Sequence, residues 1–242
     1  MKCTINKLSV YALGDHAIVF ALAPSVDTTT VNAISQLNQF IKSKNIVGIV
    51  DTIPSYHTLT LIYDPNKFLF PISNFSTQLI SFCTNVISAF DEQPTQLLQN
   101  ETNIINVPVC YDSAFALDIE KISEQKNISV QEIINIHTAD IYEVYSIGFL
   151  PGFTYMGIVH ESIQIPRHEK PRMHVTAGSV GIAGLQTGIY PTNSPGGWQI
   201  IGRTPWKVFD PNPNKLAKFK VGDRIQFYPI SKIDFDKMNE NN

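Results

Sequence analysis

The sequence has few arginines and little charge of either sign. Only four of its 18 basic residues are arginines, and charged residues make up 16% of the 242 positions, with a net charge of −3. The lysines do not gather into a stripe, so the sequence lacks the electrostatic footprint of a nucleic-acid-binding domain. Nucleic acid is therefore not an expected partner.

Cysteines and standard catalytic motifs are also scarce or missing. Cys3, Cys83 and Cys110 lie far apart without a CxxC spacing, which argues against a disulfide framework and a zinc site. The six histidines lack metal-ligand spacing with carboxylates, so no metal is expected. No GxSxG, GxxxxGK[ST], HExxH or strand-borne GxGxxG pattern occurs.

Long apolar runs are missing as well. None approaches the roughly 20 residues that span a bilayer. Asp15 and His16 interrupt the one apolar region near the start that could act as a signal peptide, and no clean cleavage site follows. With 43% hydrophobic residues the chain should form globular cores, and we expect a cytoplasmic protein.

Glycine and arginine are concentrated in one window, residues 148–205. It holds ten of the 13 glycines and three of the four arginines. Glycine permits positive φ and close approach of backbones, and a guanidinium offers a rigid fork of donors for a carboxylate, a phosphate or backbone carbonyls. The window therefore predicts a binding site, a set of tight β-turns, or both.

The first 90 residues predict a small antiparallel sheet with two helices, in the order ββαββα. Short strands are expected at residues 4–12 and 17–22, and again at 46–54 and 58–63. Between these pairs, Val31, Ile34, Leu37 and Ile41 repeat with helical spacing, and residues 72–90 carry an apolar stripe of the same period. We expect an α/β domain over residues 1–92 and a polar linker at 91–103.

The remaining residues predict a β-barrel with helices at its ends. A strand at 104–111 precedes helices at 117–126 and 129–138, the second opened by a capping box of Ser129 and Glu132. Short strands separated by glycine turns follow, with a tight turn at 194–197 and strands at 198–204, 207–209 and 224–228. We expect a closed or nearly closed barrel over residues 104–231 and a frayed tail from Lys232.

The basic segment, residues 166–174, is the first candidate for chemistry. Its sequence is PRHEKPRMH, which places Arg167 and Arg172 in a stretch held by two prolines. One interpretation is recognition of an anion, either a substrate carboxylate or a phosphate. The alternative is a solvated loop that contacts a neighbouring chain.

Polar residues of the barrel strands are the other candidates. Gln186 and Tyr190 could hold a small amide or lactam, or satisfy their own hairpin. Arg203 lies between apolar residues, where it needs a structural partner or a ligand. His137 could reach the barrel mouth or be a satisfied core histidine. The candidates for binding substrate or phosphate are His137, Arg167, Arg172, Ser179, Gln186, Tyr190, Arg203 and Thr204. None of them is assigned as catalytic.

Long ordered motifs in the window identify a family. They are GFxPGFxY at 148–155, AGSV at 177–180, IAGxQTGIYP at 182–191, SPGGW at 194–198 and IGRTP at 201–205. Segments 14–17, 53–56, 107–111 and 132–137 match as well. In these residues the chain resembles subunit 1 of the allophanate hydrolase family, which includes the B subunit of bacterial 5-oxoprolinase and the inhibitor of a sporulation histidine kinase.

The resemblance implies both a fold and an activity. The implied fold is α+β, a small N-terminal α/β domain followed by a cyclophilin-like β-barrel. The implied activity is that of an ATP-dependent 5-oxoprolinase, which opens 5-oxo-L-proline to L-glutamate and in which this chain works with the C subunit (allophanate hydrolase subunit 2-like) and the A subunit. ATP would be bound by the complex, and this chain would be inactive alone. The implied alternatives are inhibition of a sensor histidine kinase and a place in an allophanate or other urea-derived amide hydrolase.

Overall fold

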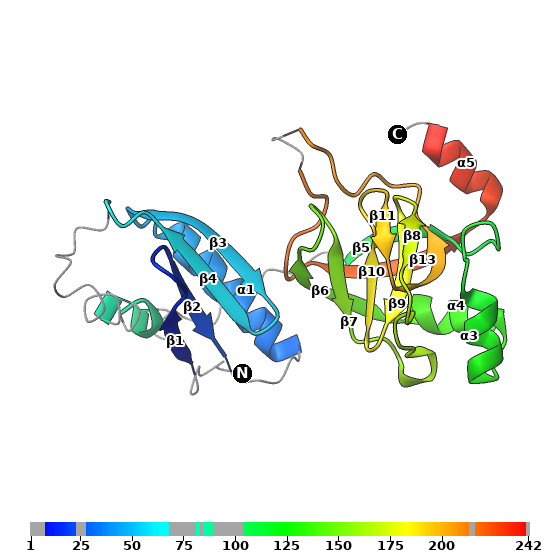
Figure 1. Cartoon of the computed structure of the whole chain (residues 1–242), viewed down its shortest axis with the longest axis horizontal. Coiled ribbons are helices and arrows are strands. Elements are labelled where there is room, and N and C mark those ends of the chain that lie inside the picture. The colour runs from blue at the N-terminus through cyan, green and yellow to red at the C-terminus, as the bar shows by residue number, and fades with distance from the viewer. Residues whose placement is uncertain are drawn as a thin grey trace. The chain divides into compact units, whose positions relative to one another are not determined.

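The computed structural model describes residues 8–22, 28–67, 81–82, 85–89, 104–212 and 216–240. Contacts divide the chain into two compact units, Met1–Glu101 and Thr102–Asn242, whose elements are labelled in Figure 1. Each unit contains its own hydrophobic core. The expected domains, residues 1–92 and 104–231, stay predictions about independently folding parts.

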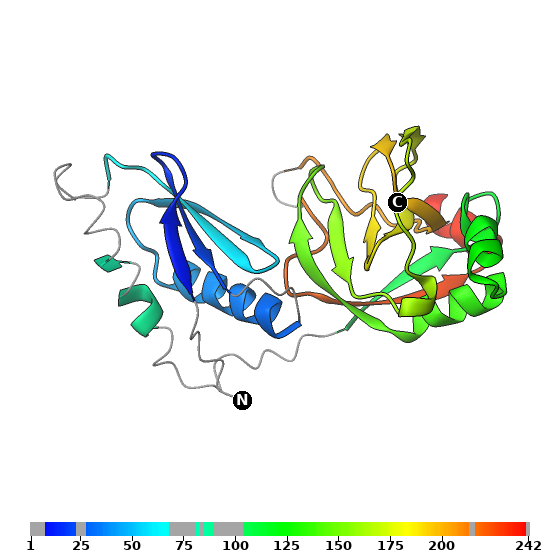
Figure 2. The ribbon, with the colours of Figure 1, turned by 60° about the horizontal axis from the view of Figure 1, so that its bottom comes forward.

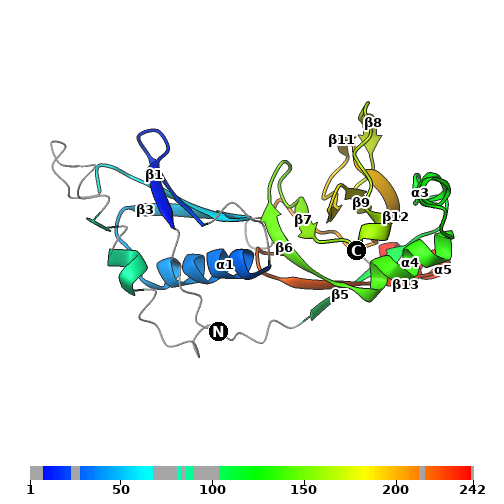
Figure 3. The same ribbon diagram turned by 90° about the horizontal axis from the view of Figure 1, so that it is seen from below.

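The N-terminal unit is an antiparallel sheet with a helix along one face. The neighbouring strands are, in order, β1 (Ser9–Ala12), β2 (Ala17–Ala21), β4 (Thr58–Tyr63) and β3 (Ile49–Ser55). Helix α1 (Thr28–Ser43) lies under this sheet in Figures 2 and 3. Buried and half-buried residues alternate along β4, as they do in a strand that is covered on one face.

Helix α1 can cover one face of the sheet because its apolar residues recur every three to four positions and so lie on one side of the helix. Ile34, Leu37 and Ile41 are buried in one cluster with Phe20 and Leu61 of the sheet. Of the second helix expected at 72–90, residues 81–82 and 85–89 are helical. The rest of that segment, residues 4–7 and the linker at 91–103 lie outside the described residues.

The C-terminal unit is a closed barrel. Its strands are, in order, β6 (Ile141–Ile147), β13 (Arg224–Ile230), β5 (Ile104–Cys110), β12 (Gln199–Arg203), β9 (Ser179–Ala183), β10 (Gln186–Ile189) and β7 (Thr154–Gly157). Strand β7 pairs back onto β6 and completes the circle. Strands β5 and β13 run parallel, so the first and last strands of the unit lie side by side. The predicted α+β fold with a barrel is confirmed.

Two helices and a short turn of 3₁₀ helix pack against the barrel. Helix α3 (Ile119–Lys126) contacts β12, helix α4 (Val130–Ala139) contacts β13, and both contact η3 (Glu161–Ile163). Helix α4 begins where the Ser129 hydroxyl accepts the N–H of Glu132 at 3.2 Å, which is the predicted capping bond. No helix in the described part of the chain is long and apolar enough to cross a bilayer.

Two expectations about short strands and turns need correction. Residues 194–197 are not only a turn, because β11 (Ser194–Gly196) is a strand that pairs with β8 (Arg172–Val175). Residues 207–209 do not form a strand, and Phe209 makes only an isolated bridge with Ala217. At 194–197 the glycines and the proline are residue types that serve both turns and the ends of strands, so the sequence did not separate the two.

The frayed tail predicted from Lys232 is also wrong. Residues Lys232–Glu240 form helix α5, drawn in red in Figure 1. The Ser231 hydroxyl accepts the N–H of Asp234 at 3.1 Å, and this caps the first turn. Phe235 is buried, with its ring centroid 4.4 Å from that of Phe115. This aromatic contact and this cap help to hold a helix whose sequence is mostly polar.

Candidate functional site

The basic segment is attached to the barrel unit through a buried carboxylate. Arg172 contacts Asp118 with both terminal nitrogens, Nη1 to Oδ2 at 2.8 Å and Nη2 to Oδ1 at 2.5 Å. Asp118 lies just before α3 and is only 3% exposed. Its Oδ2 also accepts the N–H of Ile200 in β12 at 2.6 Å. This two-pronged pair fixes the basic segment against α3 and β12.

His168 joins the same cluster through its ring. Its Nε2 lies 2.7 Å from Nη1 of Arg172 and 3.2 Å from Oδ1 of Asp118. A guanidinium has donors only and a carboxylate has acceptors only, so Nε2 of His168 lies within reach of a donor on Arg172 and of an acceptor on Asp118. The backbone N–H of His168 donates to the carbonyl of Gly197 at 2.7 Å, which ties the segment to the turn before β12.

The electrostatics of this cluster favour a permanently charged Asp118. Burial alone would raise the pKa of its carboxyl, but the hydrogen bonds from Arg172 and from the Ile200 N–H, together with the charge of Arg172, outweigh that effect. The pKa of Asp118 therefore lies below its ordinary value. Both terminal nitrogens of Arg172 are taken up by this buried anion, so its geometry is that of a structural pair.

A groove with a volume of about 560 Å³ lies beside the cluster, between α3 and the basic segment. It is termed the basic groove here. Its lining residues are Lys121, Gln125, Ile165, Pro166, Arg167, His168, Glu169, Lys170 and Gln199. Three of these carry exposed cationic side chains, whereas Glu169 is the single acid of the set. The rim of the groove is therefore positive and attracts anions.

Arg167 and Gln199 occupy neighbouring places in this groove. The guanidinium carbon of Arg167 lies 5.8 Å from the ring centroid of Trp198, a cation–π distance. Gln199 is 2% exposed, and its side-chain N–H donates to the carbonyl of Pro166 at 3.0 Å. Its Oε1 is buried and has no hydrogen-bond partner among the described residues. The wall of the groove thus combines a cation with an unpaired acceptor.

His137 is a core histidine, which is one of the two alternatives that the sequence left open. It is fully buried, with Nδ1 2.8 Å from the Tyr111 hydroxyl and Nε2 2.9 Å from the Thr187 hydroxyl. The Thr187 hydroxyl donates to the carbonyl of Gly181, so it accepts from Nε2 of His137, and Nδ1 accepts from Tyr111. Burial lowers the pKa of His137 to about 3. Both nitrogens are occupied, and the ring stays neutral.

Four further candidates meet around Gly178. The N–H of Thr204 donates to the carbonyl of Gly178 at 2.9 Å, and the N–H of Gly178 donates to the carbonyl of Tyr190 at 2.7 Å. Ser179 accepts the N–H of Tyr190 and lies opposite Arg203 across β9 and β12. Gly178 has a φ of +83°, and an added Cβ would lie 2.5 Å from the Thr204 carbonyl oxygen, so only glycine fits there.

The side chains of this second cluster are largely engaged within the protein. Ser179, Tyr190 and Thr204 are buried, and the Thr204 hydroxyl accepts the N–H of Trp206 at 3.2 Å. Burial raises the pKa of Tyr190, although its hydroxyl also accepts the N–H of Trp198. These contacts are those of a tightly bonded barrel wall.

Arg203 has a structural partner, as its apolar neighbours required. Its Nε donates to the carbonyl of Ala177 at 2.8 Å. Its guanidinium carbon lies 5.7 Å from the ring centroid of Phe115 and 5.5 Å from that of Phe235 in α5. Burial lowers the pKa of this guanidinium. A backbone bond and two aromatic rings therefore hold Arg203 in its half-buried position.

The eight predicted residues thus fall into separate places. Arg167 and Arg172 lie at the basic groove, His137 lies in the barrel core, and Gln186 opens β10 opposite Gly157. The other four are Ser179, Tyr190, Arg203 and Thr204, which surround Gly178.

Sequence reasoning missed several groups at the groove. They are Asp118, Lys121, Gln125 and Gln199. Asp118 and Gln199 come from elements far apart in the sequence, so no local motif joins them. The available signals were a carboxylate directly before a helix and a lone amide inside an apolar strand.

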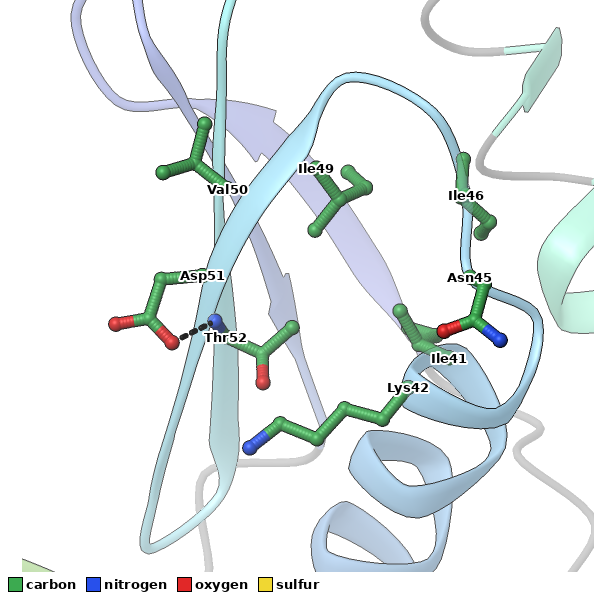
Figure 4. A pocket seen from close by; sticks show the side chains of 8 residues that line it. All are labelled: Ile41, Lys42, Asn45, Ile46, Ile49, Val50, Asp51 and Thr52. Carbon is green, nitrogen blue, oxygen red and sulfur yellow. Dashed lines mark hydrogen bonds between the residues drawn. The ribbon is translucent and has the colours of Figure 1, made fainter. Parts of the chain in front are cut away.

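A second hollow, of about 330 Å³, lies in the N-terminal unit between the end of α1 and β3 (Figure 4). Lys42 and Asp51 bring opposite charges to it, and Oδ1 of Asp51 accepts the N–H of Thr52 at 2.7 Å. None of the sequence-predicted site residues lines it. This hollow has one cation and one acid, whereas the basic groove has three cations and one acid. The basic groove is therefore the better candidate for an anionic ligand.

Known proteins resemble the chain over nearly its whole length. A protein of Bacillus subtilis (strain 168), named as the B subunit of 5-oxoprolinase, is 34% identical over 238 residues, which cover 97% of this chain and 98% of that protein. A protein of the same name from Escherichia coli O157:H7 is 32% identical over 225 residues, covering 93% and 97%. A crystal structure of TTHA0988 matches with a TM-score of 0.74 and 27% identity over 89% of this chain, but only 40% of that longer chain.

The family that the motifs indicated is confirmed by these matches. The family model described as carboxyltransferase domain, subdomain C and D, matches residues 8–219, which include both compact units in large part. The TTHA0988 structure supports the same mixed α/β fold. The chain therefore belongs to the carboxyltransferase domain, subdomain C and D, family.

Proposed function

We propose that this chain is one component of an ATP-dependent 5-oxoprolinase, which opens 5-oxo-L-proline to L-glutamate together with partner subunits. The observation that carries the proposal is the end-to-end likeness to the B subunit of 5-oxoprolinase from Bacillus subtilis, at 34% identity over 97% of this chain. The likeness extends through both units, so it reflects more than a shared barrel.

The chemistry of lactam opening suits the charges of the basic groove. An amide carbon is a poor electrophile, and a phosphoryl group transferred from ATP to the lactam oxygen would prepare that carbon for attack by water. Such a step needs cations near the phosphoryl oxygens and near the substrate carboxylate. In this proposal Lys121, Arg167 and Lys170 supply cations, while the pair of Arg172 with Asp118 keeps the segment in place.

The remaining predicted residues are proposed to shape the barrel wall. They are His137, Ser179, Gln186, Tyr190, Arg203 and Thr204. The proposed partners are the C subunit, which is allophanate hydrolase subunit 2-like, and the A subunit. ATP is proposed to bind to the complex, and this chain is proposed to be inactive by itself.

Reconstitution tests this proposal directly. The chain is co-expressed with the A and C subunits, and the purified mixture is supplied with 5-oxoproline and ATP. We expect glutamate and ADP to form together, and to stop when any one of the three polypeptides is left out. The proposal is overturned if the complete mixture forms no glutamate, or if it forms glutamate equally well without this chain.

A further inference from the structure

The basic groove offers two kinds of chemistry on neighbouring residues. Its cations come from α3 and from the basic segment, and Arg167 lies on the face of Trp198 with its guanidinium carbon 5.8 Å from the ring centroid. A stacked guanidinium keeps its N–H groups pointing outward in the plane of the fork, where they can meet an anion. The nearby charge of Asp118 is already paired with Arg172 and does not cancel this field.

Gln199 adds a need for a hydrogen-bond donor, which an anion alone does not supply. Its amide nitrogen is used by the carbonyl of Pro166 at 3.0 Å, which also fixes the orientation of the amide. The remaining atom, Oε1, can only accept, and it is buried without a partner among the described residues. A buried acceptor without a donor is unfavourable, so a ligand with an N–H would complete this wall.

The two requirements lie close together in space. Gln199 bonds Pro166, the residue directly before Arg167, and follows Trp198, on which Arg167 stacks. A matching ligand therefore carries both an N–H and an anionic group within one small molecule. Lactam carboxylates have this arrangement, because the ring nitrogen and the carboxylate are attached to the same carbon.

We infer that the basic groove binds a small lactam carboxylate of the 5-oxoproline type, with Gln199 accepting the lactam N–H and Arg167 holding the carboxylate. This inference rests on the proposed function and assigns its substrate to one groove of this chain. Gln199 would then be a specificity-determining residue that recognises the N–H of the ligand.

Ligand comparison on the purified full chain tests the inference. Binding is followed by calorimetry for 5-oxoproline, for N-methyl-5-oxoproline, in which a methyl group replaces the hydrogen of the N–H, and for 2-pyrrolidinone, which lacks the carboxylate. We expect saturable binding of 5-oxoproline and roughly tenfold weaker binding of each analogue, since one hydrogen bond to a buried or charged group has about that effect. Equal binding of the N-methyl analogue, or no saturable binding of 5-oxoproline, overturns the inference.

Three variants connect this pattern to the residues. Gln199→Leu removes the acceptor at similar length, and Arg167→Gln removes the charge. Lys218→Gln serves as the matched control, because Lys218 also stacks on a tryptophan, 4.2 Å from the Trp206 ring, but does not line the groove. We expect Gln199→Leu to lose the preference for 5-oxoproline over its N-methyl analogue, Arg167→Gln to weaken both carboxylates roughly tenfold, and Lys218→Gln to change neither. Parental affinities in the first two variants contradict the assignment.

The reconstituted complex separates this inference from the proposed function. If the complex forms glutamate and the Gln199→Leu and Arg167→Gln complexes keep the parental KM for 5-oxoproline, the groove assignment fails while the function stands. If the complex forms no glutamate, the function fails, whatever the purified chain binds. A raised KM in both variants, with normal assembly and a parental KM for ATP, supports the assignment.

Discussion

The barrel core and the basic groove bury polar side chains to a similar depth but treat them differently. In the core, His137 is fully buried and both of its ring nitrogens are bonded, to Tyr111 and to Thr187. In the groove, Gln199 is 2% exposed and is bonded through its amide nitrogen, while Oε1 has no partner among the described residues. A polar group whose hydrogen bonds are all made within the protein helps to fix the packing around it. A polar group at a groove with an unpaired atom can still bond a ligand.

The same contrast holds between two arginines of the basic segment. Both terminal nitrogens of Arg172 meet the carboxylate of Asp118, whereas Arg167 is exposed and lies on an aromatic ring. Residue type alone therefore does not reveal a binding group. What matters is whether its donors or acceptors are already used.

Replacing Arg172 by alanine should have the largest effect on stability. It leaves the buried carboxylate of Asp118 without its cation. Because the Arg172 side chain is 30% exposed and Asp118 keeps the N–H of Ile200, we expect a cost of about 3 kcal/mol, the low end for breaking a buried pair. The free energy of unfolding of the barrel unit can be measured in denaturant by tryptophan fluorescence, because the two tryptophans of the chain, Trp198 and Trp206, lie in that unit.

The control for this prediction is Arg167→Ala in the same segment. Its loss should change the free energy of unfolding by less than about 1 kcal/mol, since an exposed cation–π contact contributes that little. Equal stability of the two variants would contradict the distinction between a structural arginine and one that is free for a ligand.

The adjacent glycines at the end of β11 provide the second prediction. An added Cβ at Gly196 would meet the ring and hydroxyl of Tyr190 at 2.4–2.7 Å, whereas at Gly197 its nearest neighbour would be Pro171 at 3.7 Å. Gly196→Ala should therefore destabilise the barrel unit by about 1–3 kcal/mol through overpacking.

Gly197→Ala is the matched control for this pair. It should be tolerated, because its methyl group points at the basic segment with ordinary van der Waals spacing. The denaturant midpoints of unfolding of Gly196→Ala, Gly197→Ala and the parent chain are compared in the same buffer. If Gly197→Ala were the more harmful change, overpacking against Tyr190 would not be what distinguishes the two glycines.

Much of the fold was predictable because it depends on local patterns. The spacing of Ile34, Leu37 and Ile41 predicted α1, and the capping box at Ser129 predicted the start of α4. Helix α5 was missed because its stability comes from the contact of Phe235 with Phe115, which lies in a distant part of the chain. Such tertiary contacts override a polar local sequence.

The candidate site was predictable only in part, for a related reason. Arg167 was found because its residue type and its place in the basic segment both suggest anion binding. The engagement of Arg172 by Asp118, and the unpaired oxygen of Gln199, depend on how α3 and β12 meet the segment in three dimensions. Sequence patterns identify which groups are present, but packing decides which of them remain unpaired.

The third prediction concerns acid stability and His137. Its pKa is about 3 in the folded chain, against 6.5 for an ordinary histidine. The unfolded chain therefore binds a proton that the folded chain refuses between these values, so stability is fully present above pH 6.5 and is lost as the pH falls. At pH 5 this loss amounts to about 2 kcal/mol for a single group.

Replacing His137 by glutamine should remove this contribution, although the variant is less stable at pH 7. Unfolding free energies at pH 7 and pH 5 are compared for the variant, the parent chain and His174→Gln, which changes an exposed histidine. Only His137→Gln should gain relative stability on acidification. An unchanged difference between His137→Gln and the parent would show that the core histidine does not oppose protonation.

The fourth prediction concerns Glu143 in β6, whose effect on stability has the opposite sign to that of His137. Burial raises the pKa of this carboxyl to about 7 from 4.5, although the charge of Arg224 on the neighbouring strand lowers it in part. Between these values the folded chain keeps a proton that the unfolded chain has released. Stability from this group is therefore present at low pH and is lost as the pH rises through that window.

Glu143→Gln should thus become increasingly favourable relative to the parent as the pH rises from 5 to 8, while Glu124→Gln, an exposed change in α3, should not. Because His137 and Glu143 act in opposite directions between pH 5 and 7, their effects partly offset in the parent chain, and a flat pH profile there would not count against either. The single variants must diverge, with His137→Gln gaining on acidification and Glu143→Gln gaining on alkalinisation. If the Glu143→Gln variant follows the parent at every pH, Glu143 is charged in the folded chain and must have a partner that offsets its burial.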